Sequence, residues 1–130
     1  MQLLYVPPHL LDAVWGLILP GLESVQKHSA ETDMIEEVSA AVSCETASLH
    51  IGFDPDYRGF IVLKPEQFLT RRNLHVWCYY TIGNRFDMSV LDSMARKLGA
   101  KTMTFKSNRP GWKKNRFGFK PIYTVYRRDL

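Results

Sequence analysis

Hydrophobic residues at helical spacing predict two helices in the first third of the chain, behind a short apolar strand. Met1 to Val6 forms the strand, which a proline pair ends. The apolar stripe of the first helix consists of Leu10, Leu11, Val14, Trp15 and Ile18. Pro20-Gly21 is expected to interrupt or end this helix. Thr32 suits the N-cap of the second helix. The buried stripe of that helix consists of Ile35, Val38 and Val42.

The middle of the chain alternates apolar and polar residues, which predicts β-structure. Ala47 to Phe53 alternates with period two, and the cluster at 54–59 is rich in turn residues. Phe60 to Leu63 is expected to form the second arm of a hairpin, which Pro65 limits. The long apolar run Leu74 to Ile82 is rich in aromatic and β-branched residues, and it predicts a central strand buried on both faces.

Another helical stripe and two further strands are predicted in the last part of the chain. Asp87 suits the N-cap of a helix from Met88 to Leu98, and Gly99 suits its C′ position. The residues expected to face inward on this helix are Val90, Leu91, Met94 and Leu98. The remaining elements are a strand at Lys101–Phe105, a turn at 108–111, a short helical turn at Trp112–Arg116 and a strand at Pro121–Arg127. The order β-α-α-β-β-β-α-β-(α)-β predicts an α+β fold, and the length of 130 residues indicates one domain over residues 1–130.

Charge divides the chain into an acidic end and a basic end. Residues 1–56 hold one base and nine acids, a net charge of −8, whereas residues 101–130 hold nine bases and one acid, a net charge of +8. This polarity predicts an anionic partner at the C-terminal end, such as the phosphates of a cofactor, nucleic acid, or the acidic face of a neighbouring protein. Alternatively, the two ends of the domain neutralise each other.

The four histidines and two cysteines show no metal-binding spacing. Cys44 and Cys78 lie in apolar runs without C-x-x-C spacing, which predicts two buried free thiols in a reducing compartment. No apolar run approaches about 18 residues, so we expect no membrane partner. Because the N-terminus lacks the pattern of a signal peptide, the expected location is the cytoplasm.

The sequence ends with a Gly-Phe pair followed by an aromatic strand, the stretch from Gly118-Phe119 to Tyr126. This stretch is the most specific local match by which the chain, together with the order of its elements, resembles the GNAT superfamily of N-acetyltransferases. Residues 109–112, Arg-Pro-Gly-Trp, resemble a variant found in small GNAT-like proteins of tailed bacteriophages. The resemblance implies a mixed, mostly antiparallel sheet flanked by helices, with a cleft for the pantetheine arm of acetyl-CoA or another acyl-CoA. It also implies N-acyl transfer without a metal, in the host cytoplasm or a virion if the protein is phage-encoded.

The segment after the predicted central strand departs from the family's phosphate-binding loop. That loop has the pattern Q/R-x-x-G-x-G/A, whose backbone N–H groups hold a pyrophosphate at a helix N-terminus. Here residues 81–88 contain one glycine and one arginine at other spacings, and Asp87 places a negative charge near the anion site. The family's leaving-group tyrosine corresponds to Lys114. The resemblance therefore implies a degenerate cofactor site, with the candidate residues Tyr79, Thr81, Gly83, Arg85 and Asn108.

Catalytic candidates lie on the predicted central strand. Transfer to an amine needs a general base, for which His75 and Tyr80 are the candidates, with Tyr79 as an alternative to Tyr80 and Glu66 nearby in sequence. A lone histidine at the start of an apolar strand also fits a structural role. The sequence shows no Ser/His/Asp set and no paired-carboxylate motif.

Basic residues gather between Lys106 and Lys120, where aromatic residues are interleaved with them. The patch expected to face an anionic partner consists of Lys106, Arg109, Lys113, Lys114 and Arg116. Interleaved aromatic and basic residues also suit single-stranded nucleic acid. Three functions stay open: a GNAT-type N-acyltransferase, a non-catalytic phage virion or assembly protein that acts through protein–protein contacts or as a homo-oligomer, and a nucleic-acid-binding protein.

Overall fold

The structure is a computed structural model that describes residues 2–29, 31–83, 88–106, 118–122 and 125–130. Its strands are β1 (Gln2–Val6), β2 (Ser48–Phe53), β3 (Tyr57–Gln67), β4 (Arg72–Thr81) and β5 (Thr102–Phe105). Its helices are the short 3-10 turn η1 (Pro8–Leu10), α1 (Leu11–Lys27), α2 (Met34–Ser43) and α3 (Met88–Lys97). The predicted order is confirmed as far as β5, and the helical turn predicted at 112–116 lies outside the described residues.

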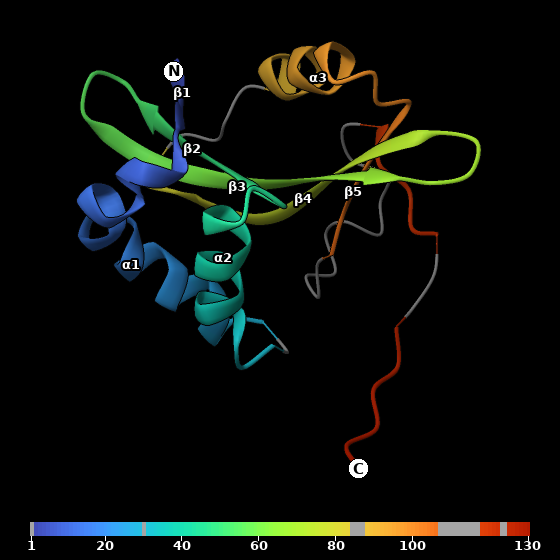
Figure 1. Ribbon diagram of the computed structural model, residues 1–130, viewed down its shortest axis with the longest axis horizontal. Coiled ribbons are helices and arrows are strands. Elements are labelled where there is room, and N and C mark those ends of the chain that lie inside the picture. The colour runs from blue at the N-terminus through green and yellow to red at the C-terminus, as the bar shows by residue number, and fades with distance from the viewer. Residues whose placement is uncertain (1, 30, 84–87, 107–117, 123–124) are drawn as a thin grey trace.

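Five strands form one sheet in the order of the sequence. Strands β1 to β4 are antiparallel neighbours, whereas β5 runs parallel to β4. A parallel pair needs a crossover connection, and α3 lies in it. Helices α1 and α2 cover one face of the sheet, and α3 covers the other (Figure 1). The predicted α+β fold, a mixed and mostly antiparallel sheet flanked by helices, is confirmed.

The larger hydrophobic core lies between the sheet and the α1–α2 pair. Its most deeply buried side chains include Ile18, Leu22, Val38, Leu49, Phe60 and Val62. Leu49 and Ile51 are both buried, which confirms the predicted inward face of β2. Because each such side chain contributes about 1.5–3 kcal/mol on burial, this cluster is a main source of stability.

Helix α1 runs without a break to Lys27, so the prediction that Pro20-Gly21 interrupts or ends it is wrong. A proline in a helix interior removes the hydrogen bond to the carbonyl four residues earlier, here that of Gly16, at a cost of about 3 kcal/mol. The helix continues because Leu22, beyond the proline, is completely buried against the sheet. The proline itself faces solvent, where the freed carbonyl can bond to water.

Gly21 allows α1 to lie close to the sheet. A Cβ atom at this position would lie 2.6 Å from Cδ1 of Tyr80 and 2.7 Å from Cε1 of Phe60. Leu10, predicted to belong to the buried stripe of the first helix, precedes α1 and is 45% exposed. The missing side chain of Gly21 therefore determines how closely α1 packs against β3 and β4.

Helix α2 begins one residue later than predicted, with Asp33 rather than Thr32 at the N-cap. The side chain of Asp33 makes no capping hydrogen bond. Instead, Oε1 of Gln26 on α1 accepts a hydrogen bond from the backbone N–H of Ile35 at 3.1 Å. A side chain of α1 thus satisfies one of the four N–H groups that a helix start leaves unpaired.

The two cysteines differ in exposure, and both are free thiols. Cys78 is buried in β4 as predicted, and its burial raises the pKa of the thiol to about 12. The prediction of burial is wrong for Cys44, which follows the last turn of α2 and is exposed. The apolar run that suggested burial ends with the helix.

The smaller hydrophobic cluster lies between the sheet and α3. Its buried members are Ile61, Leu63, Leu74, Leu91 and Ala95. Gly99 has a φ of +73° just after α3, which confirms the predicted C′ glycine. Leu98 is 40% exposed rather than inward, because α3 ends at Lys97 and the chain turns away from the sheet there. Asp87, the predicted N-cap, lies outside the described residues.

Strand β3 continues through Pro65 to Gln67, so the prediction that this proline limits the strand is wrong. Strand β2 pairs with β3 only as far as Leu63. Beyond that residue β3 has β4 as its one neighbouring strand in the described residues. A strand with an open side tolerates proline, because the missing N–H need not complete a ladder.

The strand predicted at Pro121–Arg127 is not present in the described residues of that range. Ile122 is 64% exposed, and Tyr126 is 89% exposed. The period-two pattern of these residues therefore has no sheet to pack against in the described part of the chain. Phe119 of the Gly-Phe pair packs edge-on against Phe105 of β5, with ring centroids 4.8 Å apart.

Candidate active site

Strand β5 pairs with only the first half of β4. Strand β5 pairs with Asn73 to Val76 and ends at Phe105, whereas β4 continues along β3 to Thr81. Within the described ranges, no strand takes the place of β5 beside residues 77–81, which we call the outer half of β4. An extended ligand can add to such a strand edge through main-chain hydrogen bonds.

A β-bulge at Trp77 separates the two halves of β4. Val76 pairs with Leu63 and Cys78 pairs with Val62, so one extra residue of β4 stands between adjacent residues of β3. The bulge also reverses which face each side chain occupies: Val76 packs in the cluster under α3, whereas Cys78 packs in the core under α1 and α2. Bulges bend strands and are common beside active sites.

A buried polar network joins the first half of β4 to β5. Asn73 is 1% exposed, and its Nδ2 donates to Oε1 of Glu66 and to Oγ1 of Thr104, both at 2.8 Å. Its Oδ1 accepts a hydrogen bond from the hydroxyl of Thr102, also at 2.8 Å. Both N–H groups and the oxygen of the amide are therefore paired, as burial requires.

His75 lies at the end of this network, next to the point where β4 and β5 separate. Its Nδ1 is 2.9 Å from Oγ1 of Thr104. Burial lowers the pKa of His75 from 6.5, an effect that Glu66 opposes and Lys106 and Lys64 reinforce. The ring is therefore mostly neutral at pH 7. When Nδ1 carries the proton and donates to Thr104, Nε2 has the lone pair that a general base needs.

The other catalytic candidates lie in the outer half of β4. Tyr80 stacks on Phe60, with ring centroids 5.9 Å apart, and packs against Gly21, so its ring is part of the core. Because a strand rises about 3.3 Å per residue, Tyr80 lies roughly 16 Å from His75 along β4, and the structure does not bring the two side chains together. Tyr79 is 39% exposed, so the prediction of a strand buried on both faces is wrong at this end.

The predicted cofactor-binding residues are described only in part. Thr81 pairs with Gly59 of β3, and Gly83 follows with a φ of +82° and an exposed backbone. Lys106 comes directly after β5 and is exposed. The candidates outside the described residues are Arg85 and Asn108 and, from the basic patch, Arg109, Lys113, Lys114 and Arg116.

Four contributors to this site were not singled out from the sequence. Asn73, Thr102 and Thr104 hold the polar network, and Glu31, between α1 and α2, acts electrostatically on both His75 and Cys78. The available signal was an asparagine directly before an apolar strand, since a polar residue there must find partners.

Two surface hollows lie along α1 and α2 in the described part of the chain. One is a groove between the two helices, and the other lies at the C-terminal end of α1. Neither is lined by His75 or by the outer half of β4. The candidate active site is therefore defined by the geometry of β4 and by the polar network that holds His75 beside the end of β5.

No helix of the described residues is long and apolar enough to cross a membrane. The same residues contain no group of three or more His, Cys, Asp or Glu side chains that could hold a metal ion. Half-buried Tyr57 is a further unusual group: its buried hydroxyl has no hydrogen-bond partner among the described atoms, and burial raises its pKa to about 12.

No family model matches the sequence, and no curated protein matches it. Solved structures do match. A ribosomal-protein-alanine N-acetyltransferase from Brucella melitensis biovar Abortus 2308 has a TM-score of 0.69 at 12% identity, over 100% of both chains. A GNAT family acetyltransferase from Staphylococcus aureus has a TM-score of 0.67 at 9% identity, over 99% of this chain and 98% of that one. A predicted acetyltransferase from Clostridium acetobutylicum, solved with acetyl-CoA, has a TM-score of 0.66 at 13% identity, over 99% of this chain and 96% of that one. This chain has the GNAT fold.

Proposed function

We propose that this chain is a GNAT-type N-acyltransferase that takes its acyl group from acetyl-CoA or another acyl-CoA. The observation that carries the proposal is the early end of β5, which leaves the outer half of β4 without a neighbouring strand in the described residues. The amide groups of a pantetheine arm can add to a strand edge much as a peptide does. The acetyl-CoA in the Clostridium acetobutylicum structure supports this class of ligand for the fold.

The reaction requires a base beside the thioester, and His75 supplies it. The amine nitrogen attacks the thioester carbonyl, a C–N bond forms, the C–S bond breaks, and CoA leaves as a thiolate. The proton lost by the amine passes to Nε2 of His75, and the thiolate takes up a proton from solvent. Backbone N–H groups of the outer half of β4 polarise the carbonyl oxygen. The hydrogen bond to Thr104 keeps the imidazole oriented during the transfer.

The phosphate end of CoA meets a different environment from the family's glycine loop. Residues 83–88 lack the spacing of that loop, and Asp87 adds a negative charge. Positive charge comes instead from Lys106 and from the bases that follow it in the sequence. Because this attraction is a general electrostatic one, we expect weak CoA binding that falls as salt rises.

Calorimetry with acetyl-CoA and with free CoA tests whether the cofactor binds. Saturable heat with both is the expected result, and no heat at millimolar cofactor would overturn the proposal. Release of CoA in the presence of a panel of primary amines then measures transfer. His75→Gln is expected to lower this rate by about 10²–10⁴-fold while acetyl-CoA still binds.

His50→Gln is the matched control for this experiment. His50 is also partly buried, but it lies on β2 and its ring contacts Ser48 and Tyr5 rather than the β4–β5 junction. Transfer by this variant should stay near that of the unmodified protein. Equal losses in the two variants would indicate that His75 acts through stability rather than as a base.

A second candidate is a non-catalytic role through protein–protein contacts, for example as a phage virion or assembly protein. The departures at the phosphate loop and at Lys114 favour it, together with the opposite charges of the two ends. The acetyl-CoA calorimetry separates the two candidates. Nucleic-acid binding rests on the basic residues between 106 and 120, and a gel shift at low salt tests it.

A further inference from the structure

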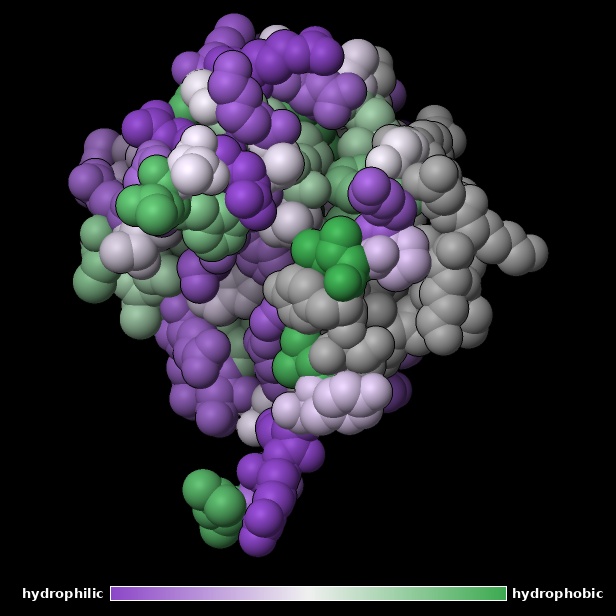
Figure 2. Space-filling view, turned by 90° about the vertical axis from the view of Figure 1, so that its right-hand side faces the viewer, coloured by the Kyte–Doolittle hydropathy of each residue, from purple (hydrophilic) through white to green (hydrophobic). Residues whose placement is uncertain are grey.

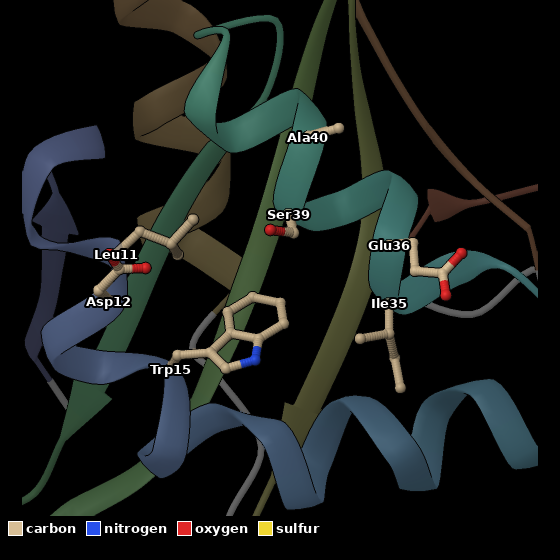
Figure 3. Close-up of a pocket in the computed structure, with 7 residues that line it drawn as sticks. All are labelled: Leu11, Asp12, Trp15, Ile35, Glu36, Ser39 and Ala40. Carbon is tan, nitrogen blue, oxygen red and sulfur yellow. The ribbon is translucent and has the colours of Figure 1, made fainter.

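A groove between α1 and α2 combines an aromatic ring with two carboxylates. It has a volume of about 400 Å³, within the range of about 300–1,000 Å³ that is typical of ligand sites. The indole of Trp15 lies at its centre, with Asp12 of α1 to one side and Glu36 of α2 to the other (Figure 3). Leu11 and Ile35 supply apolar surface to the same groove.

This combination favours a cationic side chain with apolar neighbours. A guanidinium group can stack on an indole and at the same time donate charge-assisted hydrogen bonds to carboxylates. Asp12 and Glu36 are exposed and Trp15 is half-buried, so the groove can be reached from solvent. No lysine or arginine lines it, which disfavours anionic ligands such as nucleic acid.

The chain carries a segment of matching chemistry, the C-terminal segment of residues 125–130. It presents Arg127 and Arg128 beside the exposed ring of Tyr126. Arg127 lies 3.4 Å from Asp129 in a surface ion pair, and such exposed pairs contribute little and exchange readily. The segment runs on the same side of the sheet as α1 and α2 and ends apart from both helices (Figure 1), and it projects from the body as a hydrophilic strip with a hydrophobic tip (Figure 2).

We propose that the C-terminal segment of one copy of this protein binds in the α1–α2 groove of a second copy. In an extended segment, side chains two positions apart point the same way, so Tyr126 and Arg128 enter the groove together. The guanidinium of Arg128 lies over Trp15 and between the two carboxylates, and the ring of Tyr126 covers the apolar wall. A stretch of extended backbone is enough for this contact, so neither copy has to refold.

The charge of the whole chain favours the same arrangement. Residues 1–56, which include the groove, carry a net charge of −8, and residues 101–130, which include the C-terminal segment, carry a net charge of +8. Contact between the groove of one copy and the segment of another therefore brings opposite charges together. Groove and segment are different surfaces, so the contact is head-to-tail and repeats from copy to copy into a ring or a filament.

Charge reversal on each side of the contact tests this inference in the full chain. The groove variant is Asp12→Lys with Glu36→Lys, and the segment variant is Arg127→Glu with Arg128→Glu. In sedimentation velocity we expect the unmodified protein to assemble at about 0.05 M NaCl and to dissociate at about 0.5 M NaCl. Each variant by itself should be monomeric, with a dissociation constant raised at least roughly tenfold.

Mixing the two variants distinguishes a head-to-tail contact from other forms of association. Between them the variants keep one intact joint, formed by the segment of the groove variant and the groove of the segment variant. An equimolar mixture should therefore assemble at low salt at least as far as a heterodimer, and the reversed groove and the reversed segment, which again carry opposite charges, can extend the assembly. A mixture that stays monomeric would overturn the proposal.

The matched control is Glu23→Lys with Glu37→Lys. It makes the same change of charge on the same two helices but at exposed positions that do not line the groove. This control should assemble like the unmodified protein. Dissociation of the control, or an unmodified protein that is monomeric at low salt because its segment binds elsewhere or within its own chain, would also contradict the proposal.

Discussion

The two halves of β4 share β3 as a neighbour but are held by different interactions. From Arg72 to Val76 the strand lies between β3 and β5, and hydrogen bonds fix its polar residues Asn73 and His75. From Cys78 to Thr81 it pairs with β3, and the ring of Tyr80 packs against α1. One half joins β3 to β5, and the other has β3 as its one neighbouring strand in the described residues.

The difference between the two halves begins at one extra residue of β4, Trp77, where the strand bulges. The bulge at Trp77 exchanges the faces of the side chains that follow it, so that Cys78 enters the core under α1. The outer half is thereby packed against α1, whereas no strand of the described residues lies on the side where β5 accompanies the first half. If this view is right, substitutions in the two halves should disturb different properties.

The largest expected effect is the loss of pairing between β3 and the outer half. Gly59 pairs with Thr81 at a φ of +144°, and a Cβ atom there would overlap the backbone carbonyl oxygen of Tyr80. Gly59→Ala should therefore lower the free energy of unfolding by roughly 3 kcal/mol or more, through strain and overlap together. Urea denaturation measures it.

Gly83→Ala separates these two causes. Gly83 also has a positive φ, +82°, but a Cβ atom there would meet nothing within 4 Å. Its substitution should cost only about 1 kcal/mol, from backbone strain. Equal losses at Gly59 and Gly83 would show that overlap with β4 has no part in the effect.

The next effect concerns the first half of β4. Asn73→Ala removes the amide and with it the hydrogen bonds to Glu66, Thr102 and Thr104, while Thr104 keeps its contact with His75. We expect a loss of about 2 kcal/mol and faster hydrogen exchange at the amides of β5. Gln67→Ala, which removes an exposed side chain next to β4, should change both measurements little. Unchanged exchange in β5 after Asn73→Ala would contradict the role given to the network.

A smaller effect concerns the anchor of the outer half on α1. Gly21→Ala places a methyl group against Tyr80 and Phe60. Overpacking costs about 1–3 kcal/mol and the better helix propensity of alanine returns about 1 kcal/mol, so the net loss should be about 1 kcal/mol. Gly16→Ala, on the same helix with nothing within 4 Å, should stabilise the protein instead. A gain of stability in both variants would show that α1 does not approach β4 closely.

Local patterns in the sequence predicted most of the fold. The apolar stripes of α1 and α2 and the long run of β4 were enough to place these elements, because burial of a regular pattern decides them. Pro20 and Pro65 misled the prediction, since each is a local signal that the surrounding tertiary contacts override. Leu22 beyond the first proline and the β4 ladder beside the second hold those elements together.

The candidate site was less predictable than the fold. His75 could be selected from the sequence as an ionisable residue on an apolar strand. The bulge at Trp77 and the network around Asn73 could not be, because both depend on which residues of β3 and β5 lie opposite, and register is a property of the assembled sheet. The described residues around Tyr126 have an alternating pattern typical of a strand, but they are exposed and do not form one. In the described part of the chain they have no neighbouring strand with which to pair.

The smallest expected effect is the part that His75 contributes to a loss of stability in mild acid, and it tests whether this ring is neutral in the folded protein at neutral pH. Folding lowers the pKa of His75 from 6.5, so the folded ring stays neutral while the unfolded ring takes up a proton. The stabilising contribution is therefore full above about pH 6.5 and is lost as the pH falls toward the lowered pKa. The pKa of His50 is shifted in the same direction, since burial lowers it to about 4. His50 should therefore contribute more than His75 to the loss of unfolding free energy in acid.

Urea denaturation at two pH values resolves the two histidines. The difference in unfolding free energy between neutral and mildly acidic buffer should shrink strongly in His50→Gln and slightly in His75→Gln. An NMR titration of the His75 ring should give a midpoint below 6.5 that moves lower in Glu66→Gln, because this carboxylate is the group that opposes the effect of burial. A midpoint above 6.5 would mean that Glu66 outweighs burial. The contribution of His75 would then change sign, so that protonation of its ring would stabilise the folded protein in mild acid instead of destabilising it.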